Sequence, residues 1–501
     1  MSRTQRRRLP VSDPPTPADR WHRGGRYRPL SDADCQQVID SAFDILTRVG
    51  LSGAPSWLTL ALQNTGARVR EDGRILFPRL VIERAIRRAC HQVTLPGFNI
   101  NQGLEIGGGY VHIGTGGAAV QTLDARNNAY CESSLADLYR MMRILDQCEH
   151  VHYGVRPLVA RDMPTPLDLD INTAFACLKG TAKPIGVSFD SAGHVVPVCE
   201  LFDLALERED GFRQQPFCMA VIVHVVSPLR FASEGVEIMR TAIDAGMPLQ
   251  ICSAAQAGAT SPASLAGALA QGLAESLAGL MVVDAIKPGH PCIFAFMPFI
   301  SDLRTGAMTG GSGESAVANA AAAQLLGELS LPSTVSAGMT DSKIEDAQAG
   351  YEKGYSVALA AQAGADMINL SVGMLGSIMV ASPESLVIDN DMCGAILRSV
   401  RGIDINSASL DVEAIERVVS GDGHFLGEPQ TLALMKSEYQ YPSLADRQSV
   451  ADWLASGAES IWERAQARVD GMLANDRPDH LSRDAEARIR QEFDIRLGQE
   501  N

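Results

Sequence analysis

The 501-residue sequence lacks several features that would mark its function at once. Aromatic residues make up 5% of the chain, and no H-E-x-x-H, His-rich or paired-Cys motif indicates a zinc site. The ten cysteines include no C-x-x-C pair, which is typical of reduced core residues rather than of disulfides. We therefore expect no metal site and no disulfide framework.

Charge and hydropathy argue against two classes of partner. A net charge of −16 leaves little basic surface for a phosphate backbone, so nucleic-acid binding is not expected. The longest apolar run, 277–286, contains Asp284 and is too short to span a bilayer. The basic segment 1–25 has no apolar stretch of the signal-peptide kind and is predicted to be a disordered arm. These features predict a cytoplasmic protein that binds no membrane.

What the sequence does contain is a repeated unit of apolar strand, polar loop and helix. Eight such units predict an α/β fold, a TIM (β/α)8 barrel, because near-continuous apolar strands alternating with long helices fit a closed parallel barrel better than an open sheet. The barrel is predicted over 111–403, with a helical lead-in over 26–110 and a C-terminal helical extension over 404–501. The predicted strands are 111–115, 152–159, 184–189, 217–226, 248–253, 292–296, 334–337 and 367–372.

Two loops of these units are unusually rich in Gly, Asp and Thr. The segment 295–314 reads AFMPFISDLRTGAMTGGSGE, and the segment 333–354 reads STVSAGMTDSKIEDAQAGYEKG. Barrel enzymes carry their chemistry on the loops that follow the strands. We therefore expect the functional site on the loops after the sixth and seventh strands.

Long ordered phrases of the sequence resemble the trimethylamine methyltransferase family of corrinoid-dependent enzymes. They include HIGTGGAAVQTLD at 112–124, AGMTDSK at 337–343 and VIDNDMCGAILR at 387–398, and the similarity extends from about residue 24 to about residue 495. The resemblance implies a methyltransferase that moves a methyl group from a methylated amine to the cobalt of a corrinoid. It further implies that a partner protein supplies this cobalamin-type corrinoid and that the chain holds no tightly bound cofactor. We also expect a homo-oligomer.

The seventh-strand segment bears on the substrate. Family members that demethylate trimethylamine carry pyrrolysine, expected near this strand, whereas 332–343 is an uninterrupted run of ordinary residues. This departure favours a quaternary amine such as glycine betaine, because a permanently cationic nitrogen can leave as a tertiary amine without being given a proton. The sequence singles out no catalytic residue.

Other functions stay open at this point. The substrate could be trimethylamine or another tertiary methylamine. A non-catalytic betaine-binding barrel would usually carry an output domain, and a barrel lyase or hydrolase would need a metal cluster or an acid/base pair. Neither feature stands out in the sequence.

Aromatic side chains are candidates for holding a quaternary ammonium group. Each aromatic face contributes roughly 0.5 to 2 kcal/mol to binding a cation. Phe294, Phe296 and Phe299 lie in or just after the sixth strand, and alternation lets the first two share one face of that strand. Ordinary barrel core is the alternative interpretation for all three.

A betaine carboxylate needs a cationic or backbone donor. Arg156 and Arg304 lie at the ends of the second and sixth strands, and Lys343 follows the seventh. Solvated or structural ion pairs are the alternative role for these three residues. Asp302 and Asp341 either balance the ammonium group or hold the basic residues in place.

Uncharged side chains complete the predicted site. Thr340 and Gln256 can offer hydrogen bonds from the loops after the seventh and fifth strands. His224 at the end of the fourth strand is either a neutral pocket histidine or a histidine whose hydrogen bonds are satisfied in the core.

Overall fold

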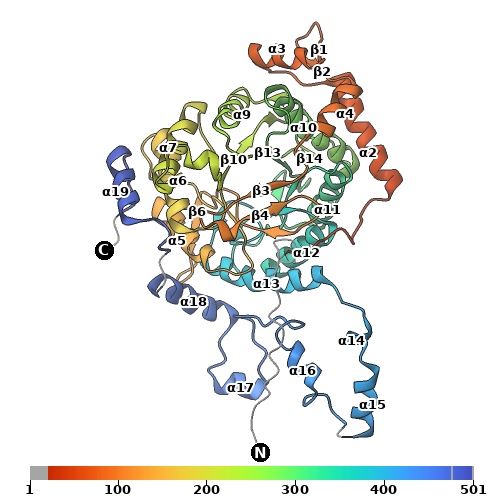
Figure 1. Cartoon of the computed structure of the whole chain (residues 1–501), viewed down its shortest axis with the longest axis vertical. Coiled ribbons are helices and arrows are strands. Elements are labelled where there is room, and N and C mark those ends of the chain that lie inside the picture. Colours follow the sequence, from red (N-terminus) through yellow and green to blue (C-terminus); the bar gives the residue numbers. More distant parts are fainter. Residues whose placement is uncertain (1–20, 422, 476–477, 499–501) are drawn as a thin grey trace, which may run out of the picture.

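The computed structural model describes residues 21–421, 423–475 and 478–498, and it contains a closed barrel (Figure 1). Eight parallel strands form one sheet, and a parallel bridge between Gly114 and Tyr153 joins its two edges. The predicted TIM barrel is therefore confirmed. Its strands are β5 (His112–Ile113), β8 (Gly154–Val155), β9 (Ile185–Val187), β10 (Cys218–Val223), β13 (Leu249–Ser253), β15 (Cys292–Phe296), β18 (Ser333–Ser336) and β19 (Met367–Asn369).

One long helix follows the loop after each strand and packs outside the barrel. Serine and threonine side chains cap several helix starts. For example, α13 begins at Pro383, because Ser382 caps a first turn that opens with proline. The apolar helix α10 is long enough to cross a membrane, but 89% of its most apolar window is buried inside the protein. The helices are α5 (Leu135–Asp146), α6 (Pro166–Gly180), α7 (Val195–Leu206), α9 (Ser233–Ala245), α10 (Leu265–Ile286), α11 (Gly313–Glu328), α12 (Ala347–Ala363) and α13 (Pro383–Arg401).

The lead-in to the barrel contains the expected helices and, in addition, hairpins that the prediction of a helical lead-in did not include. The predicted helix over 57–68 ends at Asn64, because Gly66 adopts a φ of 99°. The elements here are α2 (Asp32–Asp44), α3 (Ser56–Asn64), β1 (Arg68–Val69), β2 (Ile75–Leu76), α4 (Arg79–Arg88), β3 (Val93–Leu95) and β4 (Leu104–Ile106).

The start of the chain is attached to the barrel earlier than predicted. Residues 1–20 of the predicted basic arm lie outside the described residues. Trp21 packs edge-on against His112, with ring centroids 4.6 Å apart, and the Gly25 amide donates to the Gln362 carbonyl oxygen at 2.7 Å. The predicted boundary at residue 25 is therefore several residues too late.

The C-terminal extension is helical, but its segments behave differently. α18 packs against α13 and α5, and α19 packs against α7, whereas α14 to α17 extend away from the barrel (Figure 1). The predicted helix over 449–475 is divided, because Gly457 and Ala458 both adopt positive φ angles. These helices are α14 (Ser407–Leu410), α15 (Val412–Ser420), α16 (Pro429–Leu434), α17 (Val450–Ala455), α18 (Ile461–Asn475) and α19 (Arg483–Glu492).

Packed side chains fill the amino-terminal part of the barrel interior. The β3–β4 hairpin closes this end, and its apolar residues join one buried cluster with Tyr153, Met219 and Ile293. The Tyr153 hydroxyl donates to Asn369 Oδ1 at 2.6 Å. Gly114 leaves room for the Tyr153 ring, since a Cβ at this position would lie 2.4 Å from the ring.

Replacing Gly114 with alanine should lower the free energy of unfolding by about 1 to 3 kcal/mol, because the added methyl group overpacks the barrel interior. Gly327→Ala is a matched control, since Gly327 lies in α11 with no atom near its added Cβ, and it should be neutral or stabilise by about 1 kcal/mol. Urea unfolding measures both. If the two variants changed the free energy of unfolding equally, the prediction would be wrong, because the Tyr153 ring would then move aside without cost.

Candidate active site

A cavity of about 1130 Å³ lies at the carboxyl ends of the last four barrel strands. The loops that follow β13, β15, β18 and β19 line it, together with the short strands β16 (Phe299–Ser301) and β17 (Met308–Thr309). Barrel enzymes have their active sites at this end, because the loops there converge while the strands fix their starting points. The loop positions predicted from the sequence therefore meet in one hollow.

Asp341, from the loop after β18, places a negative charge on the cavity wall. Its carboxylate accepts hydrogen bonds from Gly310 N at 2.9 Å, Ser377 Oγ at 2.7 Å and the Thr309 hydroxyl, with Gly311 N at 3.4 Å. Burial works against its ionisation, but these hydrogen bonds outweigh burial and lower the pKa of Asp341. Among the described residues no Lys, Arg or His side chain forms an ion pair with this carboxylate.

Glu352 from α12 supplies a second carboxylate to the same cavity. It accepts from Thr340 Oγ1 at 2.5 Å, from the Asp341 amide at 2.8 Å and from Gln348 Nε2 at 2.9 Å. Gly311 permits this approach, because a Cβ there would lie 2.2 Å from Glu352 Oε2. Within the described part of the chain, both carboxylates are held by neutral donors alone. The wall therefore suits a cationic ligand.

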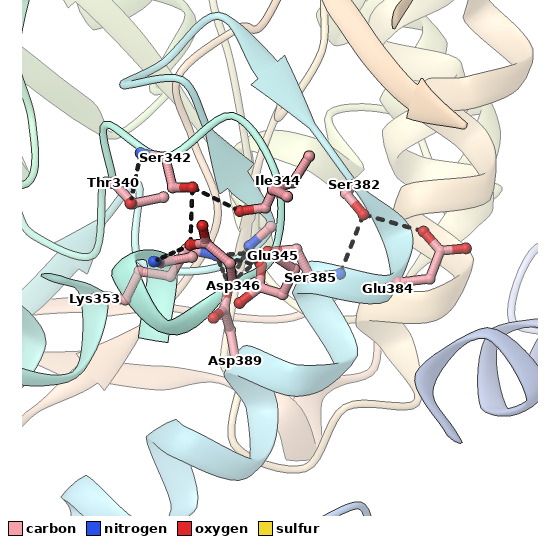
Figure 2. A network of polar contacts seen from close by, with 12 residues as sticks. Thr340, Ser342, Ile344, Glu345, Asp346, Lys353, Ser382, Glu384, Ser385 and Asp389 are labelled. Carbon is pink, nitrogen blue, oxygen red and sulfur yellow. Dashed lines mark hydrogen bonds and ion pairs between the residues drawn. The ribbon is translucent and has the colours of Figure 1, made fainter. Parts of the chain in front are cut away.

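A buried charged network, which we call the Lys353 network, fixes the loops behind this wall (Figure 2). Lys353 Nζ is fully buried and lies 2.9 Å from Asp389 Oδ2, 3.2 Å from Glu345 Oε2 and 2.5 Å from Ser385 Oγ. Asp389 Oδ2 also accepts from the Gly373 amide at 2.8 Å. The network thus joins α12 and α13 to the loops after β18 and β19.

One lysine faces two carboxylates in this network. Burial raises the pKa of Asp389 to about 7, although the charge of Lys353 opposes the shift, and the neighbouring Glu345 raises it further. Burial also works against the charge on Lys353, but Asp389 and Glu345 outweigh it and raise the lysine pKa. Lys353 therefore stays charged, and burial lets Asp389 keep its proton to a higher pH than an exposed carboxyl does.

Short polar contacts complete the loop after β18. Ser342 Oγ donates to Asp346 Oδ1 at 2.9 Å, and Asp346 caps α12 by accepting from the Ala349 amide at 3.0 Å (Figure 2). The Thr340 hydroxyl, which bonds Glu352, also accepts from the Ser342 amide at 3.0 Å. The segment that carries Asp341 is therefore fixed from both sides.

Four predicted charged residues, Asp302, Arg304, Asp341 and Lys343, do line the cavity. Arg304 is 89% exposed and forms two hydrogen bonds to the Asp302 carboxylate, which lower the pKa of Asp302 to about 2. The Arg304 guanidinium thus binds a carboxylate of its own loop. Lys343 Nζ contacts the Asp341 carbonyl oxygen at 2.6 Å and forms no ion pair within the described residues. Lys343 is the cation available to a ligand.

The two predicted uncharged residues support the cavity from behind its lining. Thr340 orients Glu352, as described above, and Gln256 Nε2 donates to Ser301 Oγ at 2.8 Å. Ser301 itself lines the cavity. These residues position the loops.

Three residues predicted to bind the ligand point away from the cavity and lie between the strands and the surrounding helices, so their predicted positions in the site are wrong. Phe294 and Phe296 are fully buried against the helix layer, where a Cβ on Gly272 of α10 would lie 2.3 Å from the Phe296 ring. His224 is also buried, with Nε2 2.9 Å from the Glu275 carbonyl oxygen of α10. Both faces of a barrel strand are buried, so alternation alone did not show which face points inward.

The remaining two candidates lie near the mouth but not on the cavity wall. Phe299 is partly buried against an apolar cluster that includes Cys252 and Met297. Arg156 is largely buried, and burial lowers its pKa while the Asp170 charge opposes the shift. No aromatic side chain among the described residues lines the cavity, so aromatic faces are not what meets a ligand there.

The sequence interpretation missed Glu352, Thr309 and Ser377. Thr309 and Ser377 come from loops distant in sequence and meet only at Asp341. The sequence did contain a signal for this region. A helix rich in small residues packs closely on its neighbours, so Glu352 and Lys353 within α12 are expected to be buried and to need polar partners.

The barrel and the carboxylate-lined cavity define a TIM-barrel protein with its site on the loops after the strands. Residues 2–499 match the family described as Trimethylamine methyltransferase (MTTB), and the chain belongs to this family. Members of the family are methyltransferases, and the chain is accordingly an enzyme of that class.

Its relatives include proteins named for two substrates. The chain is 27% identical over 482 residues to glycine betaine methyltransferase of Desulfitobacterium hafniense strain Y51, covering 95% of this chain and 98% of the relative. It is 27% identical over 465 residues to trimethylamine methyltransferase MttB of strain DSM 10664 / DCB-2, covering 92% of each. Among solved structures it is similar to Methanosarcina barkeri monomethylamine methyltransferase (MtmB), with a TM-score of 0.45, 11% identity and coverage of 88% of this chain and 94% of that one.

Lys353→Met should lower the free energy of unfolding by about 3 to 5 kcal/mol, because it leaves two buried carboxylates without their cation. Lys343→Met removes an exposed lysine ten residues earlier and should change stability by less than about 0.5 kcal/mol. Urea unfolding at neutral pH compares them. A Lys353→Met protein as stable as the Lys343→Met protein would contradict the role given to the network.

The pKa of Asp389 predicts a pH dependence of stability. Because this pKa is about 7 in the folded protein and about 3.9 in an unfolded chain, the folded state binds more protons between these values. The contribution of Asp389 to the free energy of unfolding should therefore fall as pH rises from about 4 to about 7. Asp389→Asn should remove this part of the slope in urea unfolding measured at several pH values. Identical slopes in both proteins would contradict the assignment.

Proposed function

We propose that the chain transfers a methyl group from a quaternary amine, glycine betaine or a similar betaine, to the Co(I) of a corrinoid carried by a separate protein in the cytoplasm. The observation that carries this proposal is the charge of the cavity wall. Asp341 is ionised, sits beside Glu352, and is held by neutral donors only. A wall of this kind suits a ligand whose positive charge is permanent.

The chemistry of a quaternary amine fits this wall. In the proposed reaction Co(I) supplies the electron pair for the new cobalt–carbon bond, and the electrons of the broken carbon–nitrogen bond stay on nitrogen. The nitrogen therefore leaves as a neutral tertiary amine, and no proton donor is required. Since the ammonium charge disappears as the bond breaks, the carboxylates favour the bound substrate over the transition state. Their role is to bind and orient the substrate.

A betaine also carries a carboxylate, and Lys343 is placed to receive it. Lys343 lines the cavity two residues after Asp341, so one loop presents both an anion and a cation. Arg304 is less suited, because Asp302 already occupies its guanidinium. A zwitterion matches this pair of charges better than trimethylamine does, which has no carboxylate. The name of the glycine betaine relative supports the same choice.

The proposal is tested by incubating the purified protein with candidate amines and either Co(I) cobalamin or a corrinoid protein. Glycine betaine or a related betaine should consume Co(I), seen by its absorbance, and should release the tertiary amine in equal amount. Rapid demethylation of trimethylamine with every betaine inert would reject the quaternary substrate and leave the methyltransferase class standing. No methyl transfer from any methylated amine would reject the activity.

Two variants separate the recognition of the two charges. A useful competitor is 3,3-dimethylbutanoate, which keeps the carboxylate of glycine betaine and replaces the ammonium group by a neutral carbon. Asp341→Asn should weaken betaine binding about ten- to a hundredfold and the neutral competitor much less, because the coulombic attraction between an ammonium group and a carboxylate about 4 Å apart is on the order of 1 to 4 kcal/mol. Lys343→Met should weaken both compounds by a similar factor.

The control for these variants is Lys287→Met, an exposed lysine outside the cavity that should change neither affinity. The measurements are the KM for betaine and the inhibition constant for the competitor. If Asp341→Asn weakens the neutral competitor as strongly as betaine, the carboxylate shapes the loop and does not recognise the charge.

A further inference from the structure

A long segment beside the barrel exposes an unusual amount of apolar surface. We call residues 403–421 and 423–460 the projecting arm; it contains α14 to α17 and lies between α13 and α18 (Figure 1). About half of the large apolar side chains that are exposed in the described protein lie in this segment, which is roughly an eighth of the chain. Val419 is 76% exposed, Leu426 is 80% exposed and Val450 is 74% exposed. Monomeric proteins rarely leave so many large apolar side chains uncovered in one segment.

Helix α15 shows that this surface follows a pattern. At 100° per residue, Val412, Ile415, Val419, Val418 and Ala414 fall on one continuous arc of the helix. Val418 and Ala414 are buried, whereas Val412, Ile415 and Val419 are 71%, 48% and 76% exposed. The helix is amphipathic, and half of its apolar arc has nothing packed on it among the described residues.

The projecting arm is held firmly at its root. Arg398 and Arg401 of α13 form ion pairs with Glu438 at 2.5 and 2.7 Å. The Asp391 carboxylate accepts from the Leu444 amide at 2.6 Å. The base of the arm is thus fixed on the barrel while its apolar side chains point outward.

Interactions within the arm are mainly polar. Arg417 pairs with Glu428 at 3.0 Å, and Gln430 Nε2 donates to the Ala408 carbonyl oxygen at 2.8 Å. These polar bonds join α14, α15 and the start of α16. The arm therefore has a defined fold that leaves its apolar residues for a partner.

The location of the arm separates it from the candidate active site. Helices of the barrel run opposite to its strands, so α13 ends at the amino-terminal side of the barrel. The end of α13 lies beside the start of the described chain. Gly402, which follows α13, is so close to Arg26 that an added Cβ would be 2.2 Å from Arg26 Nη1. The cavity opens at the other side. A protein that delivers a methyl acceptor to the cavity approaches the side away from the root of the arm.

We propose that the projecting arm is the surface through which this chain associates with a second copy of itself. Fourteen large apolar side chains of the arm are exposed, which is a substantial share of the roughly 20 to 30 residues that each partner contributes to a stable interface of roughly 800 Å² per partner. A second copy offers the same apolar arc, as a two-fold interface requires. The arm is rich in Asp and Glu and poor in Lys and Arg, which disfavours an anionic membrane or a nucleic acid as the occupant.

Sedimentation velocity of the full chain tests this proposal. The wild-type protein should sediment with at least twice the chain mass of 53.6 kDa at micromolar concentration. The double variant Val412→Asp, Val419→Asp should shift to the mass of one chain, because both charges fall on the uncovered half of the arc. Circular dichroism and thermal unfolding should show the variant folded, since both positions are exposed.

Leu80→Asp is the matched control, because Leu80 is 77% exposed on α4, outside the arm, and this variant should keep the wild-type mass. Raising the salt concentration should tighten the association, since apolar contacts here join two acidic surfaces. A monomeric wild-type protein would overturn the proposal. An oligomer that survives the double variant, or that dissociates with salt, would overturn it as well.

Discussion

The arrangement of the candidate active site depends on one buried lysine. Lys353 has no contact with solvent, yet two carboxylates and a hydroxyl surround its ammonium group. A charge buried in this way is tolerated only where its partners are held in place. These partners come from α13 and from the loop after the seventh strand, and Asp389 in turn accepts from the Gly373 amide in the loop after the eighth strand. Satisfying Lys353 therefore fixes the position of those loops. The cavity wall that carries Asp341 is built on this support.

The two sets of carboxylates have different roles because their partners differ. In the Lys353 network a cation of the protein itself offsets part of the charge of two carboxylates. At the cavity wall Asp341 and Glu352 are held by hydroxyl, amide and carboxamide donors, which leave the net charge unbalanced. The carboxylates around Lys353 thus hold the loops rigidly, whereas the carboxylates of the cavity wall leave a negative charge that a cationic ligand can neutralise.

Much of the fold could be predicted from the sequence, and less of the site. The eight strands were predictable because each is a short apolar run followed by a polar loop. Seven of them lie inside the predicted segments, and β18 begins one residue before its segment. Phe294 and Phe296 were misplaced because both faces of a barrel strand are apolar. The pairing of Glu352 with Gly311 depends on how α12 docks on a distant loop, which no local pattern encodes. The position of Asp341 and Lys343 on the cavity lining was predictable because a polar loop that follows a strand lies at the mouth of a barrel.

The β3–β4 hairpin closes the amino-terminal end of the barrel, so the candidate active site opens at the carboxyl ends of the strands. Val93 and Leu95 are fully buried there, packed on the side chains that fill the interior. In the proposed methyl transfer, the small amine and the much larger corrinoid protein both reach the cavity through this opening. The amine must then enter before the carrier covers the entrance, and the demethylated product can leave only after the carrier withdraws. Such a geometry imposes a compulsory order of binding and release, which a barrel open at both ends would not require.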